Sequence, residues 1–168
     1  MAGLGKRLLS GVFGNCAYPR GRWGRVVLWM MNRGHGRVYR WLMDACPFAD
    51  GMRVLDVGCG GGGMARELRR RFPGMRVDGV DVSEESVATA RKVDGDGGEF
   101  KVGTAAALPA ADGSYDAAIS VESVYFWPDL GKGLRELRRV VREGGFAAAA
   151  VECSDPEKAR IWTELVGG

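Results

Sequence analysis

A run of glycines at residues 58–63, interrupted only by Cys59, constrains the fold of this chain more than any other sequence feature. The run follows the apolar segment 52–57 (MRVLDV), which predicts a buried strand. It precedes residues 64–72, which predict a helix ended by Pro73. A strand, a glycine-rich turn and a helix in this order are typical of the first unit of a nucleotide-binding α/β sheet. The run therefore predicts an α/β protein with a parallel sheet.

The alternation of strand and helix continues along the chain. Ser83 is expected to cap a helix that runs to about residue 92. Further strands are expected over residues 75–81, 99–103, 114–121 and 146–151, and further helices over residues 130–142 and 155–165. Helix 130–142 is expected to end before Gly145 and to bury Leu134, Leu137, Val140 and Val141.

Length and composition fit one globular domain. The chain has 168 residues, of which 46% are hydrophobic and 27% charged, and these values exclude disordered and fibrous classes. None of the four cysteines lies in a C-x-x-C pair or near a histidine cluster, so we expect no metal site, no disulfide framework and a cytoplasmic location. The longest apolar run, residues 26–31, is far shorter than the ~20 residues that span a bilayer.

Basic charge is concentrated at the start of the chain. Residues 1–50 carry eight Lys/Arg and two Asp/Glu, whereas residues 51–168 are mildly acidic. This segment could meet phosphates or an anionic membrane surface, or it could be a solvated basic face. We expect a helical lead-in over residues 1–50, with a helix over 25–46 that weakens at Gly34 and Gly36. It should fold as a lid over the domain formed by residues 51–168.

The glycine loop has two chemical interpretations. Gly58, Gly60 and Gly63 fit a dinucleotide fingerprint, and Asp81 follows at the distance expected of a ribose-binding acid. Because residues 61 and 62 are also glycines, this match is weak. Asp56, two residues before Gly58, would repel a dinucleotide pyrophosphate. The same carboxylate suits the cationic methionine end of S-adenosylmethionine.

Four segments resemble, in order, the motifs of class I S-adenosylmethionine-dependent methyltransferases. They are VLDVGCGGG (54–62), VDGVDVS (77–83), ALPAADGSYDAAISVESVYFWPD (107–129) and LRELRRVVREGG (134–145). The resemblance covers about residues 51–153. It implies a Rossmann-like three-layer sandwich with a mostly parallel sheet that lacks the last two strands of the family fold.

The resemblance also implies S-adenosylmethionine as cofactor and a set of residues that bind it. Asp56, Gly58 and Gly60 would line the methionine end, Asp81 would hold the ribose, and Val82 would pack on the adenine. Thr104 stands where the family often has an aspartate, so the adenine would depend on its hydroxyl or on the backbone of Ala105. The full implied set is Asp56, Gly58, Gly60, Asp81, Val82, Thr104, Ala105 and Val121.

Methyl transfer needs alignment of the acceptor more than it needs a base. If the acceptor carries a proton, Glu122, Tyr125 and His35 are the candidates to remove it. Each has a structural alternative. Glu122 could stabilise its loop, the aromatic segment 125–127 could pack on the next helix, and a lone histidine is commonly structural.

The expected fifth strand would lie at an exposed sheet edge, because the chain ends before the sixth and seventh strands of the family fold. Such an edge favours self-association and weak or absent turnover. The sequence thus favours a methyltransferase for a small-molecule acceptor, with no nucleic-acid partner. A catalytically silent cofactor-binding fragment is the alternative, and a nicotinamide-dependent oxidoreductase is less favoured.

Overall fold

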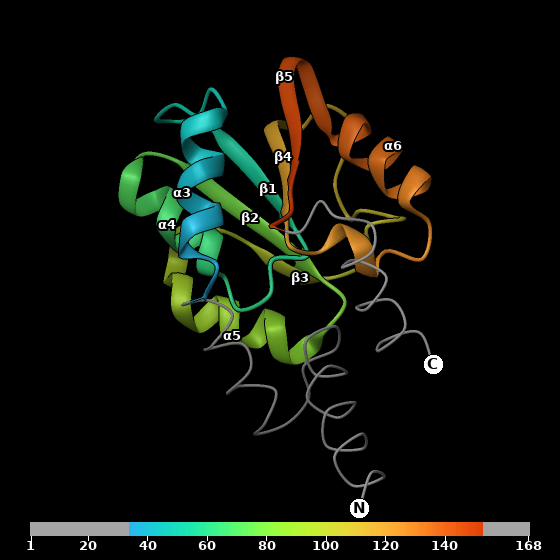
Figure 1. Cartoon of the computed structure of the whole chain (residues 1–168), viewed down its shortest axis with the longest axis horizontal. Coiled ribbons are helices and arrows are strands. Elements are labelled where there is room, and N and C mark those ends of the chain that lie inside the picture. Colours follow the sequence, from blue (N-terminus) through green and yellow to red (C-terminus); the bar gives the residue numbers. More distant parts are fainter. Residues whose placement is uncertain (1–33, 153–168) are drawn as a thin grey trace, which may run out of the picture.

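The computed structural model describes residues 34–152, in which helices and strands mostly alternate along the chain (Figure 1). The elements in chain order are α3 (Gly36–Ala45), β1 (Arg53–Val57), α4 (Gly63–Arg71), β2 (Arg76–Asp81), α5 (Glu84–Asp94), η1 (Gly95–Gly97), β3 (Phe100–Val102), β4 (Tyr115–Val121), η2 (Val124–Phe126), α6 (Leu130–Val140) and β5 (Val141–Ala150).

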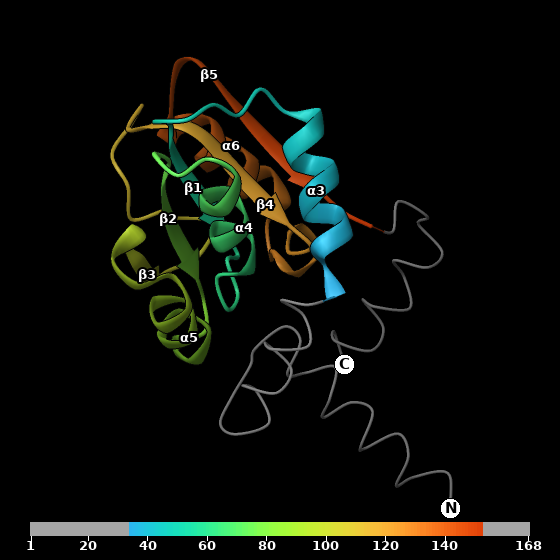
Figure 2. The ribbon, with the colours of Figure 1, turned by 90° about the vertical axis from the view of Figure 1, so that its left-hand side faces the viewer.

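The five strands form one sheet in the order β3-β2-β1-β4-β5. Every neighbouring pair is parallel. Helices α3, α4 and α5 lie on one face of the sheet and α6 on the other (Figures 1 and 2). The expected Rossmann-like α/β sandwich is confirmed, with a described sheet that is parallel throughout.

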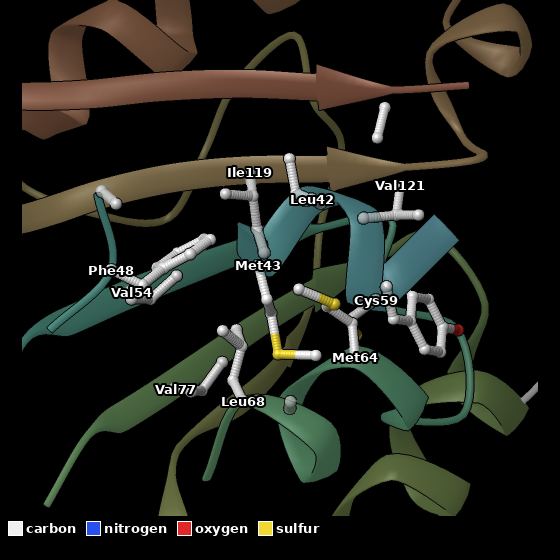
Figure 3. Close-up of a cluster of buried hydrophobic side chains, with 14 of the residues drawn as sticks. Leu42, Met43, Phe48, Val54, Cys59, Met64, Leu68, Val77, Ile119 and Val121 are labelled. Carbon is white, nitrogen blue, oxygen red and sulfur yellow. The ribbon is translucent and has the colours of Figure 1, made fainter. Parts of the chain in front are cut away.

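Successive side chains of β1 point to opposite faces of the sheet and so enter two different parts of the core. Val54 belongs to the cluster under α3 and α4, whereas Leu55 and Val57 belong to the cluster under α6. Asp56 therefore points to the face that carries Val54. Figure 3 shows Leu42 of α3 close to Ile119 and Val121 of β4. Helix α3 is thus part of the core, and each such buried aliphatic side chain contributes about 1.5–3 kcal/mol.

The expected cap of α5 is confirmed. Ser83 lies just before Glu84, and its side chain accepts a hydrogen bond from Ser86 N at 3.3 Å. The bond satisfies one of the unpaired N–H groups of the first helical turn. The helix runs to Asp94, two residues past the expected end.

The expected boundary between the last helix and the fifth strand is wrong. Helix α6 ends at Val140 and β5 begins at Val141, whereas the sequence predicts helix to residue 142 and strand from residue 146. Val141 pairs with Tyr115, and the register then shifts so that Ala117 meets Phe146. Gly144, at φ 76°, provides backbone freedom for this irregularity. Val141 is buried as a strand residue and not as part of a helix face.

The expected buried face of α6 is also wrong at one position. Leu134 is 47% exposed, whereas Gly133, Leu137 and Val140 are buried. These three residues are spaced four and three apart and share one face, from which Leu134 is rotated by about 100°. Gly133 is required there because a Cβ would strike the ring of Trp127.

Some expectations fall partly or wholly outside residues 34–152. These are the first part of helix 25–46, the lead-in up to residue 33, and helix 155–165. The lid and the domain boundary at residue 50 stay predictions. No helix within residues 34–152 is long and apolar enough to cross a membrane. β5 is an end strand of the described sheet, and self-association along it also stays a prediction.

A buried carboxylate holds the amino ends of three strands together. Asp78 of β2 is 2% exposed and accepts hydrogen bonds from Arg53 of β1 (2.8 Å), the Tyr115 hydroxyl of β4 (3.0 Å), Glu99 N (2.8 Å) and Arg76 (3.2 Å). Burial raises the pKa of Asp78, but the bonds from Glu99 N–H, Arg53 and Tyr115 outweigh it, so the pKa lies below its ordinary value.

Replacing Asp78 should therefore destabilise the fold in a pH-dependent way. We expect Asp78→Asn to lower the free energy of unfolding by about 3 kcal/mol at neutral pH, near the lower end for breaking a buried pair because Arg53 and Arg76 are half exposed. The stabilisation of the fold by a carboxyl with a lowered pKa is complete above about pH 4 and is lost as the pH falls through that pKa. Urea denaturation at several pH values tests this. Equal stability of the two proteins at pH 7 would contradict it.

Candidate functional site

The carboxyl ends of the central strands bring three acidic residues to one edge of the sheet. Asp56 lies near the end of β1, Asp81 ends β2, and Glu122 follows β4. In open α/β sheets this edge is where ligands bind. Three residues that the sequence singles out separately therefore share this edge.

The glycine loop is folded onto the end of β2. Gly58 N and Cys59 N both donate to Val80 O, at 2.7 and 3.1 Å, and Gly60 N donates to Asp81 Oδ2 at 2.9 Å. Gly58 and Gly60 adopt φ of 78° and 51°, which side-chain-bearing residues rarely reach. The loop backbone thus needs glycine to turn its N–H groups toward β2.

Asp56 is a buried acid with an unpartnered oxygen. The residue is 2% exposed, and its Oδ2 has no hydrogen-bond partner among the described residues. Burial, and then the charge of Asp81, raise the pKa of Asp56 to about 7. A buried carboxylate oxygen without a donor is costly. The arrangement fits a ligand that brings a positive charge or a donor to this point.

Asp81 is more deeply engaged than the sequence suggests. The residue is partly buried, and its oxygens accept hydrogen bonds from Gly60 N and Ser83 N, each at 2.9 Å. Burial raises the pKa of Asp81, and these two bonds oppose the rise. Each carboxylate oxygen can accept a second hydrogen bond. Asp81 can therefore shape the glycine loop and still accept from a diol.

The remaining expected cofactor residues lie near the same edge with different exposures. Val82 is 45% exposed, whereas Ala105 and Val121 are buried. Gly103 N donates to Asp81 O at 3.0 Å, which places the start of the loop after β3 beside β2. The Thr104 hydroxyl accepts a hydrogen bond from Ala106 N at 3.3 Å, so it already has a local role.

The fold brings two catalytic candidates into direct contact. The Tyr125 hydroxyl donates to Glu122 Oε2, and Glu122 Oε1 accepts from Glu152 N. Glu122 is the one residue other than glycine with positive φ (55°) among residues 34–152. Its backbone N–H donates to Ala150 O at 2.9 Å. A strained backbone that aims a carboxylate at a tyrosine is typical of functional sites, although the bond to Glu152 N is also a loop-stabilising contact.

The aromatic segment divides between two roles. The rings of Tyr125 and Phe126 meet edge to face with centroids 5.0 Å apart. Trp127 instead packs on Gly133 of α6, as the structural alternative predicts. Segment 125–127 is therefore not one continuous surface.

Helix α3 contributes a tyrosine, Tyr39, that the sequence does not indicate as part of this site. His35 precedes the first turn of α3, and its ring meets Tyr39 edge to face at 6.1 Å. Burial, and then the charges of Asp56 and Glu122 among nearby groups, raise the pKa of Tyr39. Tyr39 thus lies within electrostatic reach of both acids. The spacing of His35 and Tyr39 by one helical turn is the only sequence signal that connects them.

Within residues 34–152, no three His, Cys, Asp or Glu side chains are grouped so that they could hold a metal ion.

Neutralising Asp56 should stabilise the free protein at alkaline pH. With its pKa raised to about 7, ionisation of Asp56 opposes folding progressively between about pH 4 and pH 7. We expect the free energy of unfolding of Asp56→Asn, relative to that of wild type, to be about 2–4 kcal/mol higher at pH 8 than at pH 5. Chemical denaturation at both pH values measures this difference, with Asp96→Asn, at an exposed position, as the control substitution. A difference in free energy of unfolding between the two proteins that does not change with pH would show that the pKa of Asp56 is not raised.

Comparison with known proteins agrees with this geometry. The family described as "Methyltransferase domain" matches residues 55–149. A fatty-acid O-methyltransferase of Mycolicibacterium smegmatis is 39% identical over 98 residues, which are 58% of this chain and 36% of the relative. The chain thus spans little more than a third of that relative's length.

Solved structures show the same similarity. A chain from the complex between the Haloferax volcanii Trm112 methyltransferase activator and a methyltransferase has a TM-score of 0.77 and 31% identity, covering 86% of this chain and 64% of that one. Geranyl diphosphate C-methyltransferase from Streptomyces coelicolor, solved with S-adenosyl-L-homocysteine, has a TM-score of 0.66 and 25% identity, covering 76% of this chain and 50% of that one. With the strand order, the glycine loop and its flanking acids, these matches show that the chain belongs to the methyltransferase domain family.

Proposed function

We propose that this methyltransferase uses S-adenosylmethionine and transfers its methyl group to a small-molecule acceptor. The observation that carries the proposal is the unpartnered, buried Oδ2 of Asp56 beside the glycine loop. A cationic methionine end would supply the charge that this oxygen lacks. The pyrophosphate of a nicotinamide cofactor would add negative charge there, which disfavours the oxidoreductase alternative.

The residues of the sheet edge fit the parts of this cofactor. Asp56 would face the ammonium group, the backbone of Gly58 and Gly60 would line the methionine end, and Asp81 would accept from the ribose hydroxyls. The exposed side chain of Val82 would offer apolar contact to the adenine, with Thr104, Ala105 and Val121 completing the proposed set. When bound, the cofactor supplies a methyl carbon activated by positive sulfur.

The chain's own residues would orient the acceptor and receive its proton. Glu122 and Tyr125 form a ready acid–base pair, because the tyrosine proton is already directed to the carboxylate. With its proton so directed, the Tyr125 oxygen can interact with an acceptor N–H or O–H only by accepting. His35, which immediately precedes helix α3, is the third proposed contributor.

Relatives support a small-molecule acceptor. Their names include a fatty-acid O-methyltransferase, a 2-methyl-6-phytyl-1,4-hydroquinone methyltransferase and a demethylmenaquinone methyltransferase. These molecules differ widely in shape while sharing apolar bulk. The proposed acceptor is therefore a small organic molecule. We further propose that the protein is cytoplasmic and has no nucleic-acid partner.

Calorimetric titration tests the cofactor directly. At pH 8 we expect saturable binding of S-adenosylmethionine and S-adenosylhomocysteine and no binding of NADH. Because a proton on Asp56 competes with the ligand cation, affinity should fall as the pH drops below about 7. Asp56→Asn should bind at least about tenfold more weakly, with little pH dependence. Saturable NADH binding without a response to S-adenosylmethionine would overturn the proposal.

Asp81 offers a second test that separates its two roles. Asp81→Ala should weaken cofactor binding by about 1.5–3 kcal/mol. It should also loosen the local backbone, because the Asp81 carboxylate holds Gly60 N of the glycine loop and Ser83 N. Asp81→Asn keeps one acceptor oxygen and should retain more of the loop structure. Calorimetry and thermal melting of both variants measure the two effects separately. Wild-type affinity in both variants would show that the ribose lies elsewhere.

A further inference from the structure

Ser123 joins the end of β4 to the end of β1. Its hydroxyl donates to Val57 O at 3.0 Å and lies 2.5 Å from the hydroxyl of Ser120. Each hydroxyl has one proton. Since the Ser123 proton goes to Val57 O, the Ser120 hydroxyl must donate to Ser123. A chain of two hydrogen bonds therefore runs from fully buried Ser120 to the last residue before the glycine loop.

The glycine loop itself touches Ser123. A Cβ placed on Gly58 would lie 2.5 Å from Ser123 Cβ and closer still to its hydroxyl oxygen. The backbone of Gly58 and the side chain of Ser123 therefore fill the same small space. A shift of the loop at Gly58 must displace Ser123, because close-packed groups leave no slack.

Ser123 in turn adjoins the strained residue Glu122. The left-handed backbone of Glu122 is held on one side by its N–H bond to Ala150 O and on the other by the Ser123 contacts. Its carboxylate accepts the Tyr125 hydroxyl. A strained backbone conformation persists only while the surrounding contacts hold it. A displacement of Ser123 therefore alters the position of the Glu122 carboxylate and its hydrogen bond with Tyr125.

We propose that Ser123 is a positioning residue that couples the glycine loop to the segment 122–127. Occupation of the cofactor site would then fix the Glu122–Tyr125 pair for the acceptor. This inference rests on the proposed function, because it requires the cofactor to lie against the glycine loop.

Hydrogen exchange with S-adenosylhomocysteine as the probe tests the coupling. In the full chain, saturating probe should slow amide exchange of residues 122–127 by about tenfold or more. Ser123→Ala should bind the probe within about threefold of wild type and lose most of that protection. A merely structural serine would change exchange equally with and without the probe. Ser114→Ala removes a comparable hydroxyl-to-carbonyl bond, to Ala111 O, at the other end of β4 and should behave like wild type.

The outcomes separate the inference from the proposed function. Failure of wild type to bind S-adenosylhomocysteine overturns the proposed function and the inference with it. Normal binding without protection of residues 122–127, or with equal protection in Ser123→Ala, overturns the inference alone. If Ser123→Ala does not fold, Ser123→Cys provides the same comparison, because it keeps a side chain at this position and weakens the hydrogen bond to Val57 O. Partial loss of protection in that variant supports the coupling, and full retention overturns it.

Discussion

The carboxyl ends of β1 and β2 are held together by backbone N–H groups of the glycine loop, and the site depends on this closure. Two N–H groups of the loop reach Val80 O and a third reaches Asp81. Gly58 and Gly60 have positive φ in this turn, which is why glycine occupies these two positions. The closure brings Asp56 and Asp81 near enough for one charge to raise the pKa of the other acid.

The two edges of the sheet use buried acids in opposite ways. At the amino edge, Asp78 is surrounded by donors and has a lowered pKa, so its charge stabilises the fold. At the carboxyl edge, Asp56 lacks a donor on one oxygen and has a raised pKa, so its charge opposes folding. A ligand cation would reverse that penalty. Asp56, whose charge destabilises the free protein, is therefore the acid that a bound cation would stabilise.

Connections across the carboxyl edge are dense although the residues are far apart in sequence. Val57 meets Ser123, and Glu122 meets Ala150 and Glu152. These bonds tie the ends of β1, β4 and β5 to one another around the proposed acceptor side. The strain at Glu122 is confined to this edge, where it aims a carboxylate at Tyr125.

The sequence by itself determined the α/β class, the parallel sheet, the capped helix α5 and the position of the glycine loop between two acids. These features are local, because strand and helix periodicity and turn chemistry are encoded by neighbouring residues. Only the tertiary structure decided the others. Val141 belongs to β5 and not to α6 because it pairs with Tyr115. Gly133, which lies against Trp127, is on the buried face of α6, and Leu134 lies off that face. The hydrogen bond of Asp81 to the glycine loop and the contact of Glu122 with Tyr125 were also decided by the tertiary structure. The same is true of the proximity of Tyr39 to Asp56 and of the contact of Ser123 with Gly58. Each depends on strand order and register that no short stretch of sequence specifies, because the partners are brought together only when the sheet forms.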